Sequence, residues 1–236
     1  TWNGRYFIHK SFSPTTNGKD ISAGISTEYN SRNFKIRLSG VYIEDDFRSD
    51  LGFIRRTDIL KINPSFERTF YPKTGRIQKH AFSVTPIIIW KPELGYENSD
   101  YTIISKWNVD FNNSTNFEFS MFNRYTYLYD SFDPTRTSST ALPANIGYSY
   151  TSFEAKYRSD IRKQFSFDVS PSIGQFYNGN KYSIEGNLNW RMEPNFQTKV
   201  QINYNYISLP TPYATASIWL IGPRFDVTFN KSLFWN

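Results

Sequence analysis

Residues 105–124 read SKWNVDFNNSTNFEFSMFNR, two arms of alternating apolar and polar side chains joined by a turn rich in Asn and Ser. In the first arm Trp107 and Val109 share one face, whereas Lys106 and Asp110 share the other. A period of two is what pleated strands impose on their side chains. The stretch therefore predicts a β-hairpin with one charged face that meets water and one apolar face that meets either a protein core or lipid.

Composition narrows the class of protein. The 236 residues include no Cys and only two His, which excludes a disulfide framework and a cysteine-based zinc site and argues against histidine-rich metal sites. Lys and Arg outnumber Asp and Glu by 27 to 21, but these charges are scattered, which argues against a nucleic-acid partner. We therefore expect no cofactor, no metal and no nucleic acid.

Hydropathy alone does not decide whether the protein is soluble or lies in a membrane. Aromatic residues make up 19% of it, and strands accommodate such residues best. No run of 18 apolar residues occurs, so helical membrane spans are excluded. The mean hydropathy of −0.56 suits a soluble protein, but a sheet with lipid on one face and water on the other averages to a polar value as well.

The same alternation recurs along the chain and predicts an all-β protein of about 13 antiparallel strands. Pro64 and Pro86 fall inside two of these strands, where prolines belong at bulges or edges. The predicted strands cover residues 6–12, 21–29, 34–42, 60–70, 82–90, 105–111, 117–124, 153–158, 165–173, 182–191, 196–204 and 219–229, with a last one from 231.

Short and long connections alternate between these strands, with only the turn at 178–180 out of place. The short ones lie near Ser31, Pro72, Asn113, Ser159, Pro194 and Lys231. The longer ones begin near Ser13, Glu44, Pro92, Ser131 and Ser208. An up-and-down meander with its turns at one end and its loops at the other is typical of an outer-membrane barrel, and strands of about 10 residues are long enough to cross a bilayer.

We therefore interpret residues 1–236 as a single transmembrane β-barrel domain in the outer membrane of a Gram-negative bacterium, with long outer loops at 44–58 and 131–147. Aromatic residues gather toward both ends of the predicted strands, as at two membrane interfaces. The partners expected are outer-membrane lipid, lipopolysaccharide and other outer-membrane proteins. Bacterial barrels have an even number of strands, so we expect the 13 predicted strands to be part of a larger barrel and a longer chain.

The loop at 44–58 contains the most distinctive motif of the sequence. Its candidate functional residues are Asp50, Gly52, Phe53, Arg55 and Arg56. The simpler interpretation is that the two arginines form salt bridges with the aspartates of the same loop and so fold it. The functional alternative is that they hold a phosphate or carboxylate of a partner. Gly52 is expected to supply a backbone angle that other residues resist.

This acidic and aromatic start, followed by Leu-Gly-Phe and paired arginines, resembles a signature in the C-terminal barrels of a Bacteroidota family of outer-membrane proteins of unknown function. Residues 225–234 also resemble a segment of that family that is followed by further strands. The resemblance implies an outer-membrane barrel. Members of the family typically carry an N-terminal module similar to family 9 carbohydrate-binding domains, which implies a link to glycan handling, although that module is absent from these residues.

The charged faces of the predicted strands supply the candidate lumen-lining residues. If the bore is filled, their mixed signs predict structural ion pairs; if it is open, they determine which solutes pass. The sequence contains no spacing that suggests a nucleophile with a base or a pair of catalytic carboxylates, so we expect no enzyme. The candidates are Lys106, Asp110, Glu118, Arg124, Glu154, Lys156, Arg158, Asp168, Glu185, Arg191, Lys199, Arg224 and Asp226.

Two functions remain open. The first is a non-enzymatic, porin-like outer-membrane barrel that acts as a channel or transporter, or as an anchoring component of a surface assembly. The second is a soluble glycan-binding β-sheet protein with exposed aromatic platforms such as Trp107 and Trp190. A β-sandwich or solenoid would bury Trp107, Phe119, Leu188 and Val200 in a dry interior, whereas a barrel would expose them.

Overall fold

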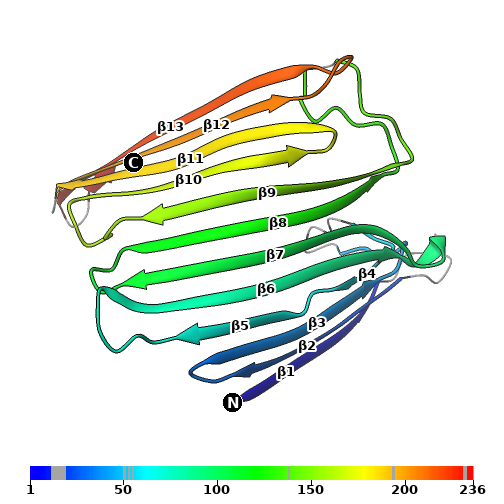
Figure 1. The fold of residues 1–236 in the computed structure, drawn as a ribbon, viewed down its shortest axis with the longest axis horizontal. Coiled ribbons are helices and arrows are strands. Elements are labelled where there is room, and N and C mark those ends of the chain that lie inside the picture. Colours follow the sequence, from blue (N-terminus) through cyan, green and yellow to red (C-terminus); the bar gives the residue numbers. More distant parts are fainter. Residues whose placement is uncertain are drawn as a thin grey trace.

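The computed structural model describes residues 1–11, 20–49, 52, 54, 56–137, 139–192, 195–230 and 233–235. They form one antiparallel sheet (Figure 1). Its strands are β1 (Trp2–Lys10), β2 (Ile21–Asn30), β3 (Phe34–Ile43), β4 (Ile59–Ile62), β5 (Ser65–Phe70), β6 (Ile77–Lys91), β7 (Glu97–Phe111), β8 (Asn116–Leu128), β9 (Ile146–Arg158), β10 (Phe165–Phe176), β11 (Gly179–Met192), β12 (Phe196–Ser208), β13 (Thr215–Asn230) and β14 (Leu233–Trp235).

Each strand pairs with the one that precedes it and the one that follows it in the chain. β4 and β5 are two halves of one crossing, because both lie between β3 and β6. The sheet therefore crosses 13 times, which confirms the prediction of an all-β, up-and-down architecture. Among the described residues β1 pairs only with β2 and β14 only with β13, so closure into a barrel stays a prediction.

Successive connections lie at opposite ends of the sheet, at the left and the right of Figure 1 in turn, as an up-and-down meander requires. Their lengths alternate only in part, because residues 92–96 and 209–214 are no longer than the turns at 71–76 and 159–164, and residues 177–178 form a short turn at the right. The connection after Pro92 is shorter than expected. A single 3-10 turn, η1 (Pro92–Leu94), ends at Gly95, whose positive φ of 69° favours glycine, and β7 begins at Glu97. β6 and β7 thereby reach 15 residues each.

Two prolines interrupt the sheet together. Pro64 follows β4 and divides the crossing in two. Opposite it, Ile88 of β6 pairs with β4 and Val84 pairs with β5, so Pro86 faces the interrupted stretch. Because proline has no N–H to donate, it is tolerated where the ladder is already broken. Both prolines thus lie at one irregularity of the sheet.

The register assigns every strand residue to one of two faces, because directly opposed residues share a face. Lys79, Asp110 and Asn116 are opposed across β6, β7 and β8, and they define what we call the charged face. All charged residues of β6 to β13 lie on this face. Elsewhere in the described strands, Arg68 of β5 and Lys10 at the end of β1 fall on the other, apolar face.

The apolar face is uncovered. Trp107, Phe119 and Leu188 are 38%, 40% and 39% exposed, and Val200 is half-buried. All described strands belong to one sheet, so no second layer packs on these residues. This excludes the two-layer sandwich for the described part of the chain. Among the described residues no helix is long and apolar enough to cross a membrane.

Aromatic side chains pair near both ends of the apolar face. Tyr101 stacks on Tyr125 toward the loops, with ring centroids 5.6 Å apart. Toward the short turns, Phe34 contacts Phe66 at 6.2 Å. The Arg68 guanidinium lies over the Phe34 ring, 5.2 Å from its centroid. The one charged residue of β5 on this face therefore makes a cation–π contact.

The loop between β8 and β9 is folded and packs against the ends of neighbouring strands. Phe132 and Leu142 form an isolated bridge within it, and the Leu142 side chain is fully buried. Phe132 contacts Tyr177 in the turn between β10 and β11, with ring centroids 5.8 Å apart. The loop covers residues 129–145, because β9 begins at Ile146 and not after the predicted end at 147. Its described residues pack over neighbouring strand ends.

Gly174 of β10 allows a close approach of two backbones. A Cβ at this position would overlap the backbone of Thr151 and Ser152 in β9, whereas a Cβ at Gly186 of β11 would meet only the Asp168 carbonyl oxygen, at 3.6 Å. We predict that Gly174→Ala lowers the free energy of unfolding by about 1–3 kcal/mol through overpacking. Gly186→Ala is the matched control and should change it far less. Denaturant unfolding of both variants measures the difference, and equal effects would contradict the close approach.

Candidate functional site

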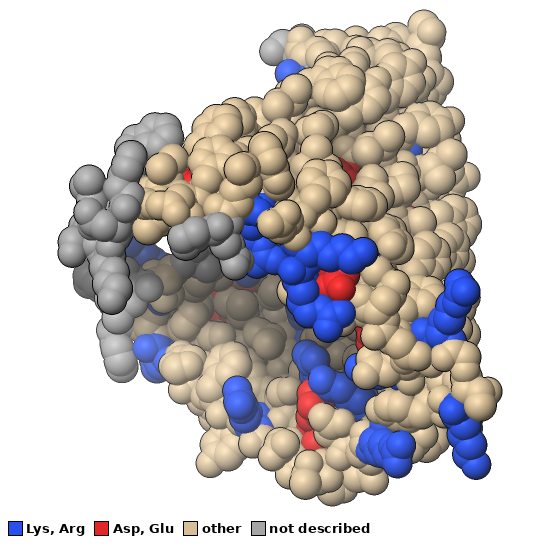
Figure 2. All heavy atoms as spheres, turned by 90° about the vertical axis from the view of Figure 1, so that its left-hand side faces the viewer, with Lys and Arg blue, Asp and Glu red and all other residues tan. Residues whose placement is uncertain are grey.

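The charged face is concave, and a polar recess hollows it at the short-turn end. The recess has a volume of about 930 Å³ and is lined by residues of β5 to β9 and of two short turns. Viewed from this end (Figure 2), the molecule is hollowed, and basic and acidic side chains gather around the opening. Five successive strands contribute to one recess because the sheet curves around it.

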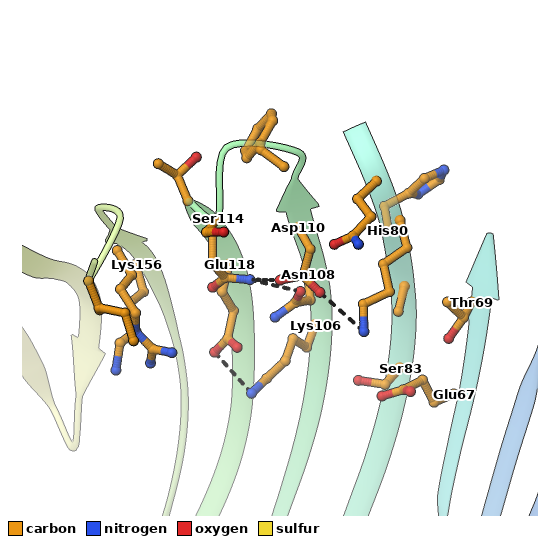
Figure 3. Close-up of a pocket in the computed structure, with 18 of the residues that line it drawn as sticks. Glu67, Thr69, His80, Ser83, Lys106, Asn108, Asp110, Ser114, Glu118 and Lys156 are labelled. Atoms are coloured by element: carbon orange, nitrogen blue, oxygen red, sulfur yellow. Dashed lines mark hydrogen bonds and ion pairs between the residues drawn. The ribbon is translucent and has the colours of Figure 1, made fainter. Parts of the chain in front are cut away.

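Ion pairs and amide hydrogen bonds hold the floor of the recess (Figure 3). Lys106 of β7 pairs with Glu118 of β8 at 2.9 Å, and Lys79 of β6 pairs with Asp110 of β7 at 3.3 Å. Asn116 donates to the Asp110 carboxylate at 2.7 Å. These contacts connect three neighbouring strands across their polar side chains, in addition to the backbone ladder.

The turn between β9 and β10 forms part of the rim. The Asp160 carboxylate accepts two hydrogen bonds from the Arg162 guanidinium, at 2.8 and 2.9 Å, and one from its backbone N–H at 3.0 Å. These bonds hold the pKa of Asp160 at about 2, well below its usual value. The turn is therefore fixed by a bidentate ion pair within a three-residue span.

A second, smaller recess of about 330 Å³ lies on the same face nearer the loops. Arg124 of β8 donates to the Ser152 hydroxyl at 2.7 Å and lies 4.3 Å from the centroid of the Phe122 ring. Lys181 of β11 lies 5.4 Å from the Phe176 ring centroid. Aromatic rings and hydroxyl groups, more than carboxylates, therefore surround the cations of this recess.

The register places every predicted lumen-lining residue on the charged face, but the residues do not form a single site. The large recess contains Lys106, Asp110, Glu118, Lys156 and Arg158, and the small one contains Arg124, Glu154 and Glu185. The others lie outside both recesses, on β10 to β13: Asp168, Arg191, Lys199, Arg224 and Asp226.

Local pairs dominate among those outer members. Asp168 accepts from Asn187 at 2.9 Å. Arg224 pairs with Asp226 two residues along the same strand, also at 2.9 Å. Arg191 donates to the backbone carbonyl of Lys163 at 3.2 Å in the turn between β9 and β10. Whether these residues line a closed bore stays a prediction.

The loop motif at 44–58 is fastened both to the sheet and to itself. Arg56 forms an ion pair with Asp100 of β7, and Asp58 faces Lys91 of β6 at 3.9 Å. Within the loop the Thr57 hydroxyl donates to the Asp45 carboxylate at 3.4 Å. That the paired arginines fold the loop through its own aspartates stays a prediction. Asp50, Phe53 and Arg55 lie outside the described residues.

Gly52 does not fulfil the backbone role expected of it. Its φ is not in the left-handed region, whereas that of Asp58 is, at 52°. Aspartate adopts this backbone angle more readily than most residues. Here its carboxylate also accepts a hydrogen bond from the Glu93 backbone N–H at 3.1 Å, which offsets the cost of the angle. The special position in this loop is thus an aspartate, which residue type alone does not reveal.

Several residues of the two recesses were missed by sequence reasoning. Glu67 and Lys79 line the large recess and Lys181 the small one. Each follows the same alternation as the named candidates, so extending the pattern through β5, β6 and β11 would have found them. Tyr150 of β9 is an aromatic residue on the charged face and is only 8% exposed.

Neither recess has the residues of a metal centre. Among the described residues, no group of three or more His, Asp or Glu side chains is arranged to hold a metal ion. The chemistry that the large recess offers is instead that of charged and amide groups, which bind solutes through hydrogen bonds and ion pairs.

The fold and the two recesses define a class of protein: a single up-and-down antiparallel sheet with its charges on a concave face and an uncovered apolar face. A family model, the domain of unknown function DUF5916, matches residues 3–233, and the chain belongs to this family. Comparisons with curated proteins and with solved structures find no match to the chain.

The Asp160 carboxylate gives the short-turn rim a defined pH dependence. Because its folded pKa of about 2 lies below the ordinary value of 3.8, the ion pair stabilises the fold above pH 4, and this contribution is lost as the pH falls toward 2. We predict that Asp160→Asn is less stable than the wild type at neutral pH and that the two converge near pH 2. Acid-titrated unfolding curves measure this convergence, and a constant difference across that range would contradict it.

Proposed function

We propose that this chain forms the wall of an outer-membrane β-barrel in a Gram-negative bacterium, with lipid and lipopolysaccharide against its apolar face. In this proposal the barrel is not an enzyme. Its charged face lines a water-filled passage for solutes, and its folded loops face outward. Other outer-membrane proteins and a surface assembly that handles glycans are the partners that the family resemblance suggests.

One observation carries the proposal: the segregation of charge to the concave face of a single sheet whose opposite face is apolar and uncovered. Monomeric soluble proteins rarely expose contiguous apolar patches larger than a few hundred Å². Here exposed apolar residues continue from Tyr6 in β1 to Phe225 in β13. Hydrocarbon covers such a surface without any partner protein, and the backbone groups of β2 to β12 are paired with neighbouring strands of the sheet.

A glycan-binding surface is supported less well. Trp107 stacks beside Phe82, with ring centroids 5.9 Å apart and planes at 6°, so a flat aromatic pair does exist. The exposed side chains around this pair, however, are mainly apolar. Phe119 lies directly opposite Trp107, and Val84 and Met121 lie next on the same face. The His80 ring contacts Phe82. Sugar platforms require polar groups beside the ring for the hydroxyls, whereas acyl chains favour the neighbours present here.

Adjacent residues of β12 test which face contacts lipid. Val200 belongs to the apolar face and Gln201 to the charged face. In the full-length protein folded into lipid vesicles, we predict that Val200→Lys lowers the free energy of unfolding by about 2–4 kcal/mol, since a lysine near the bilayer centre is expensive. Gln201→Lys, the matched control, should have a much smaller effect. Comparable losses from both variants would contradict a lipid-facing apolar surface.

The passage itself is tested by conductance. The full-length protein, extracted with detergent and reconstituted in planar bilayers, should produce discrete conductance steps and should show heat-modifiable migration on gels. A protein that is monodisperse without detergent and binds glycan arrays in a manner lost on Trp107→Ala would support the glycan-binding alternative instead. A folded, membrane-inserted protein without conductance would support an anchoring role.

A further inference from the structure

We infer that the large recess binds the carboxylate or phosphate group of an anionic solute through Lys156 and Arg158. Both side chains come from β9 and line the recess together. The inference rests on the proposed function, because a passage along the charged face is the route by which a solute reaches the site.

The cations of the recess differ in whether they are already neutralised. Lys79, Lys106 and Arg162 each have a carboxylate partner within 3.3 Å. Among the residues that the structure describes, no carboxylate lies within 4 Å of Lys156 or Arg158, and neither side chain makes a hydrogen bond. Two positive charges of β9 therefore face the recess with no carboxylate of the described residues in contact.

The carboxylates nearest in register are engaged elsewhere. Glu118 is directly opposite Lys156 across β8 and β9, but it pairs with Lys106 on its other side. Asp168 is directly opposite Arg158 across β9 and β10, but it accepts the Asn187 amide. The two carboxylates directly opposite Lys156 and Arg158 therefore do not pair with them.

Glu67 is the one acidic residue lining the recess that has no ion-pair partner among the described residues. It lies on β5, four strands from β9, which is roughly 19 Å along the sheet at about 4.8 Å per strand. Figure 3 shows Glu67 and Lys156 at opposite sides of the group. Charges separated by more than about 8 Å are largely screened at physiological salt, so Glu67 does not neutralise the pair.

The spacing of the two cations fits a compact oxyanion. Residues i and i+2 of a strand point to the same side and lie about 7 Å apart. An oxyanion between them can accept from the ammonium group on one side and from the planar guanidinium fork on the other. The concave wall also concentrates their field in the recess. An uncharged solute would gain only the weaker hydrogen bonds to a neutral acceptor from this pair, so an anionic group is the ligand chemistry that it favours.

Calorimetric titration of the detergent-solubilised full-length protein at low ionic strength tests the site, with inorganic phosphate and succinate as separate probes. We predict that both anions bind and that the double variant Lys156→Gln with Arg158→Gln loses about tenfold or more in affinity. Arg224→Gln is the control, because it removes a cation from the same face outside the recess and should leave the affinity unchanged. A preference for one probe identifies the source of the anionic group.

For Glu118→Gln we predict the opposite effect, a gain of affinity, which loss of folding cannot produce. It releases Lys106 from its ion pair, adds a third free cation to the recess, and should raise the affinity for both anions several-fold. No binding by the wild type, or equal binding by the double variant, would overturn the inference. Binding without conductance would contradict only the passage, and conductance without binding would contradict only the anion site.

Discussion

The constraint on which the whole structure depends is that a strand presents its side chains alternately to two sides. In this sheet the rule holds through most of eight consecutive strands, from β6 to β13, and is interrupted between β6 and β7 by register shifts at Ile77/Lys79 and Ile89/Trp90. Every charged residue of those strands still lies on one face. The concave, ion-paired interior and the uncovered exterior are both consequences of this one regularity, and each recess follows from the curvature of the charged side.

Much of the architecture could be predicted from the residues, because the period of two is local information. The hairpin at 105–124 and the up-and-down order of the strands are found as predicted. Details that depend on distant segments could not be predicted. Arg56 pairs with Asp100, 44 positions away along the chain. Asp58, and not Gly52, adopts the left-handed backbone, since a contact from Glu93 makes that angle tolerable.

The recesses show the same division. The sequence shows which face of the sheet a residue belongs to, so Lys106, Glu118 and Lys156 could all be assigned to the charged face. Which carboxylate pairs with which cation depends on register and side-chain reach, and these are properties of the assembled sheet. Lys156 is opposite Glu118 in the ladder, yet Glu118 pairs with Lys106. Because Glu118 pairs with Lys106, Lys156 remains available to a solute in the large recess. The alternation of polar and apolar residues does not predict which of the two cations Glu118 pairs with.

The neighbour-to-neighbour order of the sheet has a consequence for how such a wall assembles. Because each described strand pairs only with those before and after it, apart from the divided crossing of β4 and β5, no pairing must wait for a remote part of the chain. Loop-closure entropy, which slows folds rich in remote pairings, is correspondingly small at each step. The sheet can grow by adding one hairpin at a time, so the order of synthesis can also be the order of assembly.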